Sequence, residues 1–374
     1  MNKSEEISAK TARVVDLLAA NKLGGVLVSS QPNFSWLTAG GMNGVDLSRE
    51  AGNGALLVRN DGKRFVLANR IEMPRLLSEE LVGEEFEPVE FPWEEEKASP
   101  AFLPALALTL LGKDAALASD VGLGPGTVAM EAAVARCRYQ FTGSEIERFR
   151  LLASDAAQAI GALARKLTPG ETEREVARRV ADVLAAHNIR AVVNLVAADE
   201  RIQKYRHPVP TDRRWKKTIM IVVCAQRGGM IASLTRIVSS GSISDELRRR
   251  TFAAAQVNAQ LMAATQPNVS GADLYQLAAR TYAEAGFENE ERLHHQGGAA
   301  GYRTRDWVAH PACTERVQVN QAFAWNPSVT GTKVEETCIA FADGVEVLTR
   351  TSDWPQIPVQ VFGRKYLSPD ILVL

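Results

Sequence analysis

Three of the five histidines and one glutamate of this 374-residue chain could carry chemistry. His207 stands alone ahead of a proline, His294 and His295 are adjacent, and Glu335 lies in the segment KVEE. An imidazole with a pKa near neutrality can deprotonate water or protonate a leaving nitrogen. His294, His295 and Glu335 could also form a mononuclear zinc set, but adjacent histidines on one strand would point to opposite faces. A lone histidine ahead of a proline can equally be a loop residue, so both interpretations of His207 stay open.

A second polar group lies in the segment GYRTRDW, residues 301–307. Arg303 and Arg305 could clamp a carboxylate through paired hydrogen bonds, and Trp307 could stack on a planar group. The same residues could instead form a surface ion-pair cluster with Asp306. Because the segment follows a glycine-rich stretch that ends a strand, we favour the clamp and expect these side chains at a substrate site.

The elements that must position these residues begin with a hairpin. Residues 219–224 are a continuous apolar run rich in β-branched side chains, which is typical of a buried strand. Gly228 and Gly229 supply the turn, and residues 230–237 form the returning strand. His207 therefore lies a short distance ahead of a buried hairpin.

Two helix pairs, about a hundred residues apart, share one layout. Each pair has a long amphipathic helix, a turn containing proline, and a second helix opened by a capping signal, Thr172 with Glu175 and Ser270 with Asp273. Such an internal repeat predicts a pseudo-twofold α+β domain, because neither half can cover its sheet alone. The expected helices span residues 143–166, 172–187, 245–264 and 270–285.

The first 142 residues alternate helices and strands without any catalytic spacing. The turn Asn-Asp-Gly-Lys at residues 60–63 is a strong hairpin signal between two apolar runs. We expect an α/β domain over residues 1–142 and a second domain over residues 143–374. The expected helices of the first domain span residues 5–20, 72–81 and 101–111, and the strands 25–30, 53–59, 64–68 and 115–119.

Composition excludes several classes of function. A net charge of −1 gives no reason to expect nucleic acid or an anionic membrane as a partner, and 46% hydrophobic with 23% charged residues is ordinary for a globular protein. The four cysteines are scattered without a C-x-x-C spacing, which favours buried, reduced thiols. The N-terminal segment lacks an apolar signal core, and no run approaches the length of a membrane span. We therefore expect a cytoplasmic protein.

The hairpin region resembles the metal-binding hairpin of the pita-bread superfamily, which includes aminopeptidase P, prolidase and creatinase. His207, Pro210, Gly229, Thr235 and Arg236 fit its pattern of H-x-x-P, a glycine turn and S-D-x-T-R. The segment LTPGETEREVA is similar to the superfamily's helix-turn-helix signature P-G-x-T-E. The resemblance implies an α+β chain: a C-terminal pita-bread domain, a smaller N-terminal α/β domain of the creatinase type that opens with a strand and a Pro-Asn loop, and a homodimer.

The resemblance also implies a dinuclear metal site made of two Asp, one His and two Glu, and this chain departs from it at four of the five positions. Neutral or absent side chains do not hold two divalent ions. We therefore expect no metal and no other cofactor. The five positions hold, in chain order, Val222 in a full-length hairpin or Cys224 in one with a shorter turn, then Ser233, Gly298, Asn326 and Glu335.

What the resemblance preserves implies an activity. His207 matches the position of the general base in creatinase, a member that works without metal, and Glu335 would orient it or bind a substrate nitrogen cation. We expect a metal-independent hydrolase that cleaves a C–N bond (amide, amidine or ureide) of a small carboxylate-bearing compound. The alternatives are a catalytically inactive binding module and an Xaa-Pro metallopeptidase. The expected substrate contacts are His294, His295, Arg303, Arg305, Trp307 and Asn326.

Overall fold

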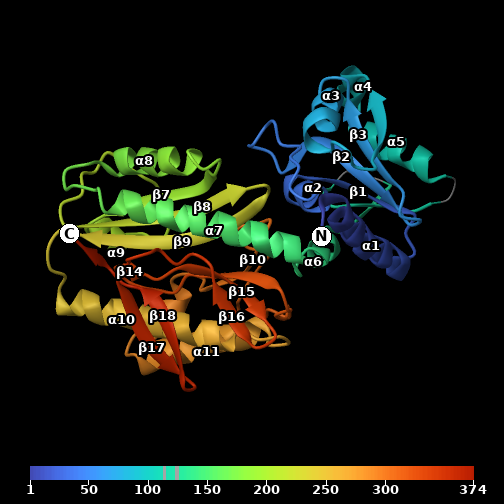
Figure 1. Cartoon of the computed structure of the whole chain (residues 1–374). Helices are drawn as coiled ribbons and strands as arrows, with labels where there is room; N and C mark the ends of the chain where they lie inside the picture. Colours follow the sequence, from blue (N-terminus) through green and yellow to red (C-terminus); the bar gives the residue numbers. More distant parts are fainter. Residues whose placement is uncertain (113–114, 123–125) are drawn as a thin grey trace. The chain divides into compact units, whose positions relative to one another are not determined.

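The computed structural model describes residues 1–112, 115–122 and 126–374, and the chain folds as two compact units (Figure 1). The first unit contains Met1–Glu145 and the turn Gly228–Met230. The second unit contains Ile146–Arg227 and Ile231–Leu374. Each unit has its own sheet structure and its own buried core, and each is described separately.

The first unit is built on a six-stranded sheet with the order β4-β3-β2-β1-β5-β6. β2 runs antiparallel to both neighbours, whereas β3–β4, β1–β5 and β5–β6 are parallel pairs. The carboxyl ends of every strand except β2 therefore lie at one edge of the sheet. The strands are β1 Gly25–Ser30, β2 Ala51–Arg59, β3 Arg64–Asn69, β4 Glu87–Phe91, β5 Leu117–Ser119 and β6 Thr127–Ala129.

The helices of the first unit differ from the sequence predictions in two places, after β1 and within residues 72–81. The expected Pro-Asn loop after β1 is the short helix α2, because the Ser30 hydroxyl accepts from the backbone of Asn33 and proline fits a helix's first turn. The expected helix 72–81 is split into a short helix and a π turn. The segments are α1 Lys3–Asn21, α2 Gln31–Leu37, α3 Met73–Arg75, the π turn η1 Leu76–Glu80, α4 Trp93–Ala98, α5 Phe102–Leu111 and α6 Glu131–Cys137.

The first half of the second unit pairs two helices with a four-stranded sheet, ordered β19-β9-β8-β7. The predicted capping box of α8 is present: Thr172 accepts from the backbone of Glu175, and Glu175 accepts from that of Thr172. Gly228 and Gly229 both have positive φ, which the tight turn between β8 and β9 requires. The elements are α7 Gly143–Ala164, α8 Glu173–Ala185, β7 Arg190–Ala198, α9 Glu200–Lys204, β8 Thr218–Arg227, β9 Met230–Ser239 and β19 Leu372–Val373.

The second half repeats this layout with a five-stranded sheet, ordered β11-β10-β12-β15-β16. Ser270 and Asp273 form the predicted capping box of α11. The elements are α10 Asp245–Ala264, α11 Gly271–Glu284, the 3₁₀ turn η2 Glu290–Arg292, β10 Gly297–Ala300, β11 Trp307–Val308, β12 Gln321–Trp325, β13 Ser328–Val329, β14 Thr332–Lys333, β15 Glu336–Phe341, β16 Gly344–Val347, β17 Gln356–Val361 and β18 Arg364–Pro369.

In both halves the helix pair lies on the outer side of its sheet, α7 and α8 in green and α10 and α11 in gold (Figure 1). The mixed α+β class and the repeat of helix pair plus sheet are thus confirmed. Near the C-terminus, β19 crosses back to pair with β9 of the first half. The helix pairs do not cover the inner faces of the two sheets, so polar groups of a site can lie there.

All four cysteines are free thiols, as the sequence indicated. Cys224, Cys313 and Cys338 are buried and Cys137 is half-buried. Among the described residues, none of the helices combines the length and the apolar character that a membrane span needs.

Candidate functional site

Three histidines that are far apart in the sequence meet in the second unit. The Nε2 atoms of His207 and His294 are 3.1 Å apart, and the rings of His294 and His295 stack with centroids 4.5 Å apart. One nitrogen from each ring lies within 4.8 Å of the other two. The expectation that His294 and His295 point to opposite faces was wrong. They precede β10 and are not part of a strand, so the alternation of a strand does not apply to them.

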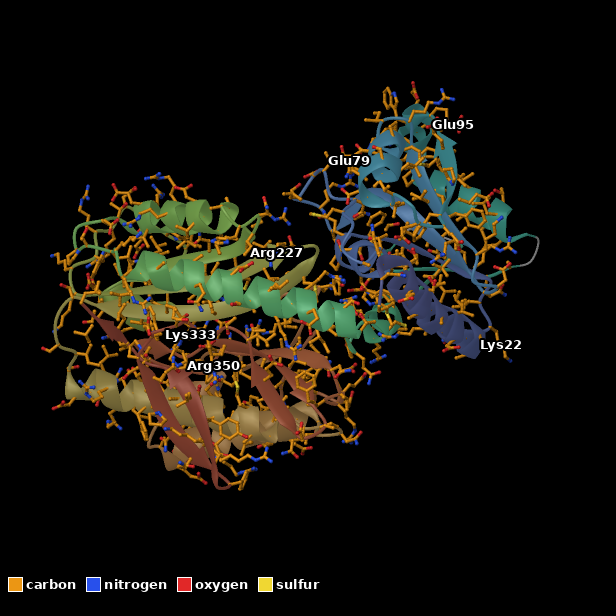
Figure 2. The ribbon with its side chains drawn as sticks, viewed as in Figure 1. Lys22, Glu79, Glu95, Arg227, Lys333 and Arg350 are labelled. Carbon is orange, nitrogen blue, oxygen red and sulfur yellow. The ribbon has the colours of Figure 1, made fainter. Side chains whose placement is uncertain are left out.

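A buried carboxylate with two cations is the second part of the site. Glu335 is 2% exposed, and its carboxylate lies 3.0 Å from Lys333 Nζ and 3.3 Å from Arg305 Nη2. The Thr235 hydroxyl on β9 donates to Glu335 Oε2 at 2.6 Å. Lys333, labelled in Figure 2, lies among the strands of this unit and is also buried. We call His207, His294, His295, Arg305, Lys333 and Glu335 the histidine–cation cluster.

The cluster keeps its imidazoles neutral. Although the His207 side chain is exposed, desolvation of its ring lowers the pKa, Lys333 and Arg305 lower it further, and Glu335 opposes them. Burial, with Lys333 and the neighbouring histidines, lowers the pKa of His294 to about 2. Burial together with Arg305 and Lys333 lowers the pKa of His295 to about 4. All three rings are therefore neutral at neutral pH and have a lone pair to accept a proton.

Glu335 stays ionised although it is buried. Desolvation acts to raise its pKa, but Lys333, Arg305 and the Thr235 hydroxyl outweigh it and hold the pKa below its usual value. The carboxylate, Lys333 and Arg305 together carry one net positive charge. This arrangement favours an anion as the next group to bind.

Two residues that sequence reasoning missed hold the His294 segment in place. The buried Tyr282 hydroxyl on α11 donates to Gln296 Oε1 at 2.6 Å and accepts from the backbone of Ser328 at 2.9 Å. Gln296 Nε2 in turn donates to the backbone carbonyl of His294. Lys333 was also overlooked, although its place two residues before Glu335 on an extended segment puts both side chains on one face.

The hairpin positions that carry aspartate in the superfamily now contact each other. The Ser233 hydroxyl lies 3.3 Å from Cys224 Sγ. Cys224 rather than Val222 is therefore the residue opposite Ser233, while Val222 packs in an apolar cluster with Met220 and Ile237. Burial and the nearby Glu335 raise the pKa of the Cys224 thiol, so it stays protonated.

The remaining positions do not fit a dinuclear metal centre. A Cβ added to Gly298 would lie 2.1 Å from the carbonyl oxygen of Trp307, so no ligand side chain can replace this glycine without moving β11. Asn326 is buried, and its Oδ1 has no hydrogen-bond partner within the described ranges. The one carboxylate, Glu335, is already paired with two cations. A single ion held by the three imidazoles would face the positive charge of Lys333 that lowers the pKa of each.

The other expected substrate contacts lie near the cluster in sequence but differ in surroundings. Arg303 lies half-buried in the turn between β10 and β11, where its carbonyl accepts from Gly301. Trp307 is mostly buried and packs edge-on against Phe323 at 5.5 Å. The substrate roles of Arg303, Trp307 and Asn326 stay predictions. His294 and Lys333 line a small cavity of about 10 Å³, about enough for one water molecule.

Comparison with known proteins gives a family match for the second unit. The model of metallopeptidase family M24 matches residues 147–348. The Xaa-Pro dipeptidase of Pyrococcus furiosus is 22% identical over an alignment of 220 residues, and the match covers 56% of this chain. The match spans 63% of that relative's length.

Solved structures resemble the whole chain. The prolidase from Thermococcus sibiricus has a TM-score of 0.78 at 17% identity, with 100% of both chains covered. The prolidase from Pyrococcus horikoshii has a TM-score of 0.76 at 18% identity, covering 92% of this chain and 98% of its own. The N-terminal domain of a FACT complex subunit from Cicer arietinum has a TM-score of 0.68 at 10% identity, covering 93% and 97%. At these identities the likeness shows the fold alone.

Proposed function

The chain belongs to metallopeptidase family M24, and from this premise we propose that it hydrolyses a C–N bond of a small carboxylate-bearing compound without the family's two metal ions. The observation that carries the proposal is the pairing of Glu335 with Lys333 and Arg305. Two fixed cations stand beside the one metal-ligand carboxylate that is kept. They supply positive charge that attracts a substrate carboxylate, and they compete with any metal ion for Glu335.

His207 is the proposed general base. Its Nε2 shares a hydrogen bond with His294 Nε2, so one ring donates and the other accepts. When His207 Nε2 donates, its Nδ1 lone pair is left to take a proton from water. The water oxygen then attacks the carbonyl or amidine carbon, the C–N bond breaks, and the proton on Nδ1 passes to the leaving nitrogen. His294 accepts throughout and keeps the ring oriented.

The cations and the neutral rings determine which groups the proposed substrate must carry. Arg305 would bind the substrate carboxylate, with Arg303 and Asn326 as further proposed contacts. His295 stacks on His294 and is also neutral, so it can donate or accept a hydrogen bond without adding charge. Glu335 would balance the charge of the two cations or accept from a substrate N–H group.

The test is hydrolysis by the full chain after chelation and metal analysis. The panel contains N-acyl amino acids, ureido and guanidino carboxylates, and Xaa-Pro dipeptides. We expect less than one transition-metal ion per chain and turnover that chelation does not change. Turnover that disappears on chelation and returns with Zn²⁺ or Mn²⁺ would overturn the metal-free mechanism.

An Xaa-Pro dipeptidase is the second candidate, and the relative from Pyrococcus furiosus favours it. This candidate requires metal-dependent turnover of dipeptides such as Ala-Pro by the wild-type chain. A binding module without turnover is the third candidate, favoured by the fold likeness to a FACT complex subunit. Ligand binding without hydrolysis of any panel member would select it.

We also propose that the chain is a cytoplasmic homodimer. The four free thiols support a reducing compartment. Light scattering after size-exclusion chromatography tests the dimer, and a mass near 40.7 kDa, that of one chain, would contradict it.

A further inference from the structure

The first unit contains a cavity of about 330 Å³, which falls in the size range of small-molecule sites. It lies where β1 and β3 end and β2 begins, and the segment containing α4 and α5 also lines it. Figure 2 labels Glu95 on α4, the helix that contributes Trp93, Glu96 and Lys97 to this cavity. Nothing in the proposed hydrolysis uses these residues.

The cavity's position in the sheet is one that suits ligands. Ligands of open α/β sheets bind at the carboxyl ends of parallel strands, where the strand order reverses. In this sheet the order reverses between β1 and β5, and the cavity lies next to that point, at the carboxyl ends of β1 and β3. Ser29, near the carboxyl end of β1, lines the cavity.

Ser29 supplies a polar atom without a partner. The residue is 4% exposed, its backbone N–H donates to Asp120 at 2.8 Å, and its carbonyl accepts from Asn43 at 3.2 Å. Its buried hydroxyl, in contrast, has no hydrogen-bond partner in the described part of the chain. A buried hydroxyl without a partner is costly, and a small rotation of this side chain toward the cavity would let a bound ligand satisfy it.

Charges of both signs surround the cavity. Glu72, which is 8% exposed, and Glu96 contribute two carboxylates, and Arg49 and Lys97 contribute two cations. Glu96 also accepts from Asn69 at 2.9 Å, and that bond fixes the carboxylate at the cavity wall. The net charge of these four side chains is zero, so the lining suits a ligand with one positive and one negative group better than a simple ion.

Apolar side chains complete the lining. Trp93 is 45% exposed although it is an indole, and Ile71 and Leu103 also face the cavity. An exposed aromatic beside a concave, partly charged surface is typical of a small-ligand site. A ligand with an apolar side chain would cover these three residues.

We propose that this cavity binds a free α-amino acid with an apolar side chain. The ammonium group would be held by Glu72 and Glu96 with the Ser29 hydroxyl, and the carboxylate by Arg49 and Lys97. The apolar side chain would lie against Trp93. This site is independent of the histidine–cation cluster and of the hydrolysis proposed for it.

Isothermal titration of the full chain with L-leucine tests the proposal. We expect saturable binding, with L-leucinamide and 4-methylpentanoate each bound at least about tenfold more weakly, because each lacks one of the two charged groups. Ser29→Val and Glu72→Gln are expected to weaken L-leucine binding at least about tenfold. Glu79→Gln, an exposed change in the same unit, is the matched control and should leave the dissociation constant unchanged. Thermal unfolding shows whether each variant is folded.

A variant of the other unit separates this proposal from the hydrolase. His207→Asn should leave L-leucine binding unchanged whatever it does to turnover. Absence of L-leucine binding to the wild-type chain would overturn the proposal. So would binding that is lost in His207→Asn and kept in Glu72→Gln, because the amino acid would then occupy the histidine–cation cluster. If Ser29→Val does not fold, the affinity of Glu72→Gln for L-leucine tests the proposal by itself.

Discussion

The two halves of the second unit share a layout of helix pair and sheet, but they differ in where charge is placed. On the β8–β9 hairpin, the first half presents Cys224, Ser233 and Thr235, which are all neutral. The second half presents Lys333 and Glu335, both buried and ionised, with Arg305 beside them. A superfamily member with carboxylates in both halves could bridge two metal ions, whereas this chain has a carboxylate on one side only.

The difference shows which part of the fold is free to change. The capping boxes and the glycine turn form as their sequence signals predict. The inner side chains of the first half only need to fill space and pair their hydrogen bonds, and a serine facing a cysteine does so. Charge in the second half also has partners in the first, because the Thr235 hydroxyl donates to Glu335 and Arg236 pairs with Glu336 at 3.0 Å.

The largest effect expected is on catalysis, where the first half still contributes a reactive side chain. His207→Ala should reduce turnover of the best panel substrate by about 10²- to 10⁴-fold, the usual contribution of a general base. Folding should be intact, because His207 is exposed. His187→Ala, also exposed and in the first half, is the control. If both variants retain full turnover, His207 is not the base.

Removing the carboxylate of the second half should destabilise the fold. Glu335→Gln leaves Lys333 and Arg305 buried without their anion, and we expect a loss of about 3–5 kcal/mol in the free energy of unfolding, measured by urea denaturation. Glu288→Gln, an exposed change, should have almost no effect. Replacing Arg305, Lys333 and Glu335 together by methionine should recover most of the loss. A small effect of Glu335→Gln would mean that water or another anion reaches the cations.

Acid should weaken the second half through its two neutral histidines. The folded pKa values of His294 and His295, about 2 and about 4, lie below the usual value of 6.5. As the pH falls below 6.5, the unfolded chain binds protons first, so the free energy of unfolding should fall by about 1.4 kcal/mol per pH unit for each histidine. The His295 contribution should level off below pH 4. Urea denaturation of His295→Asn should give a flatter profile between pH 6.5 and 4, and an unchanged profile would contradict this.

The smallest effect should come from the neutral hairpin itself. Ser233→Ala removes only a weak hydroxyl–thiol contact and should cost less than about 1 kcal/mol in the free energy of unfolding. Thr235→Val, two residues further along the same strand, removes a hydrogen bond to the buried Glu335 and should cost about 1.5–3 kcal/mol. Equal losses in the free energy of unfolding from the two variants would show that the Ser233 contact contributes as much as the hydrogen bond to the charged Glu335.

Much of the fold could be predicted because its signals are local. Capping boxes at Thr172 and Ser270 and the glycine pair at 228–229 each act within a few residues, and the structure confirms all three. The short strand β6 and the π turn η1 carry no comparable local signal in the sequence. The Pro-Asn segment was misread because a proline early in a helix and a proline in a loop look alike in sequence.

The site could be predicted only in part because it is assembled from distant segments. The resemblance pointed to His207 and Glu335. The stacking of His294 on His295 could not be predicted, because both residues lie in the irregular segment between η2 and β10. The role of Lys333 was invisible for a different reason. A lysine two residues before a glutamate in sequence is usually part of a solvated pair, and only the fold shows that both are buried.

The burial of Cys224 has a consequence for its reactivity toward oxidants and alkylating agents. Only a thiolate attacks such reagents, and burial with the nearby Glu335 raises the pKa of Cys224. Desolvation likewise raises the pKa of Cys137 to about 11 and that of the buried Cys338. Iodoacetamide and peroxide should therefore modify the native chain slowly. The thiol beside the histidine–cation cluster is therefore expected to stay protonated and unreactive in the folded chain.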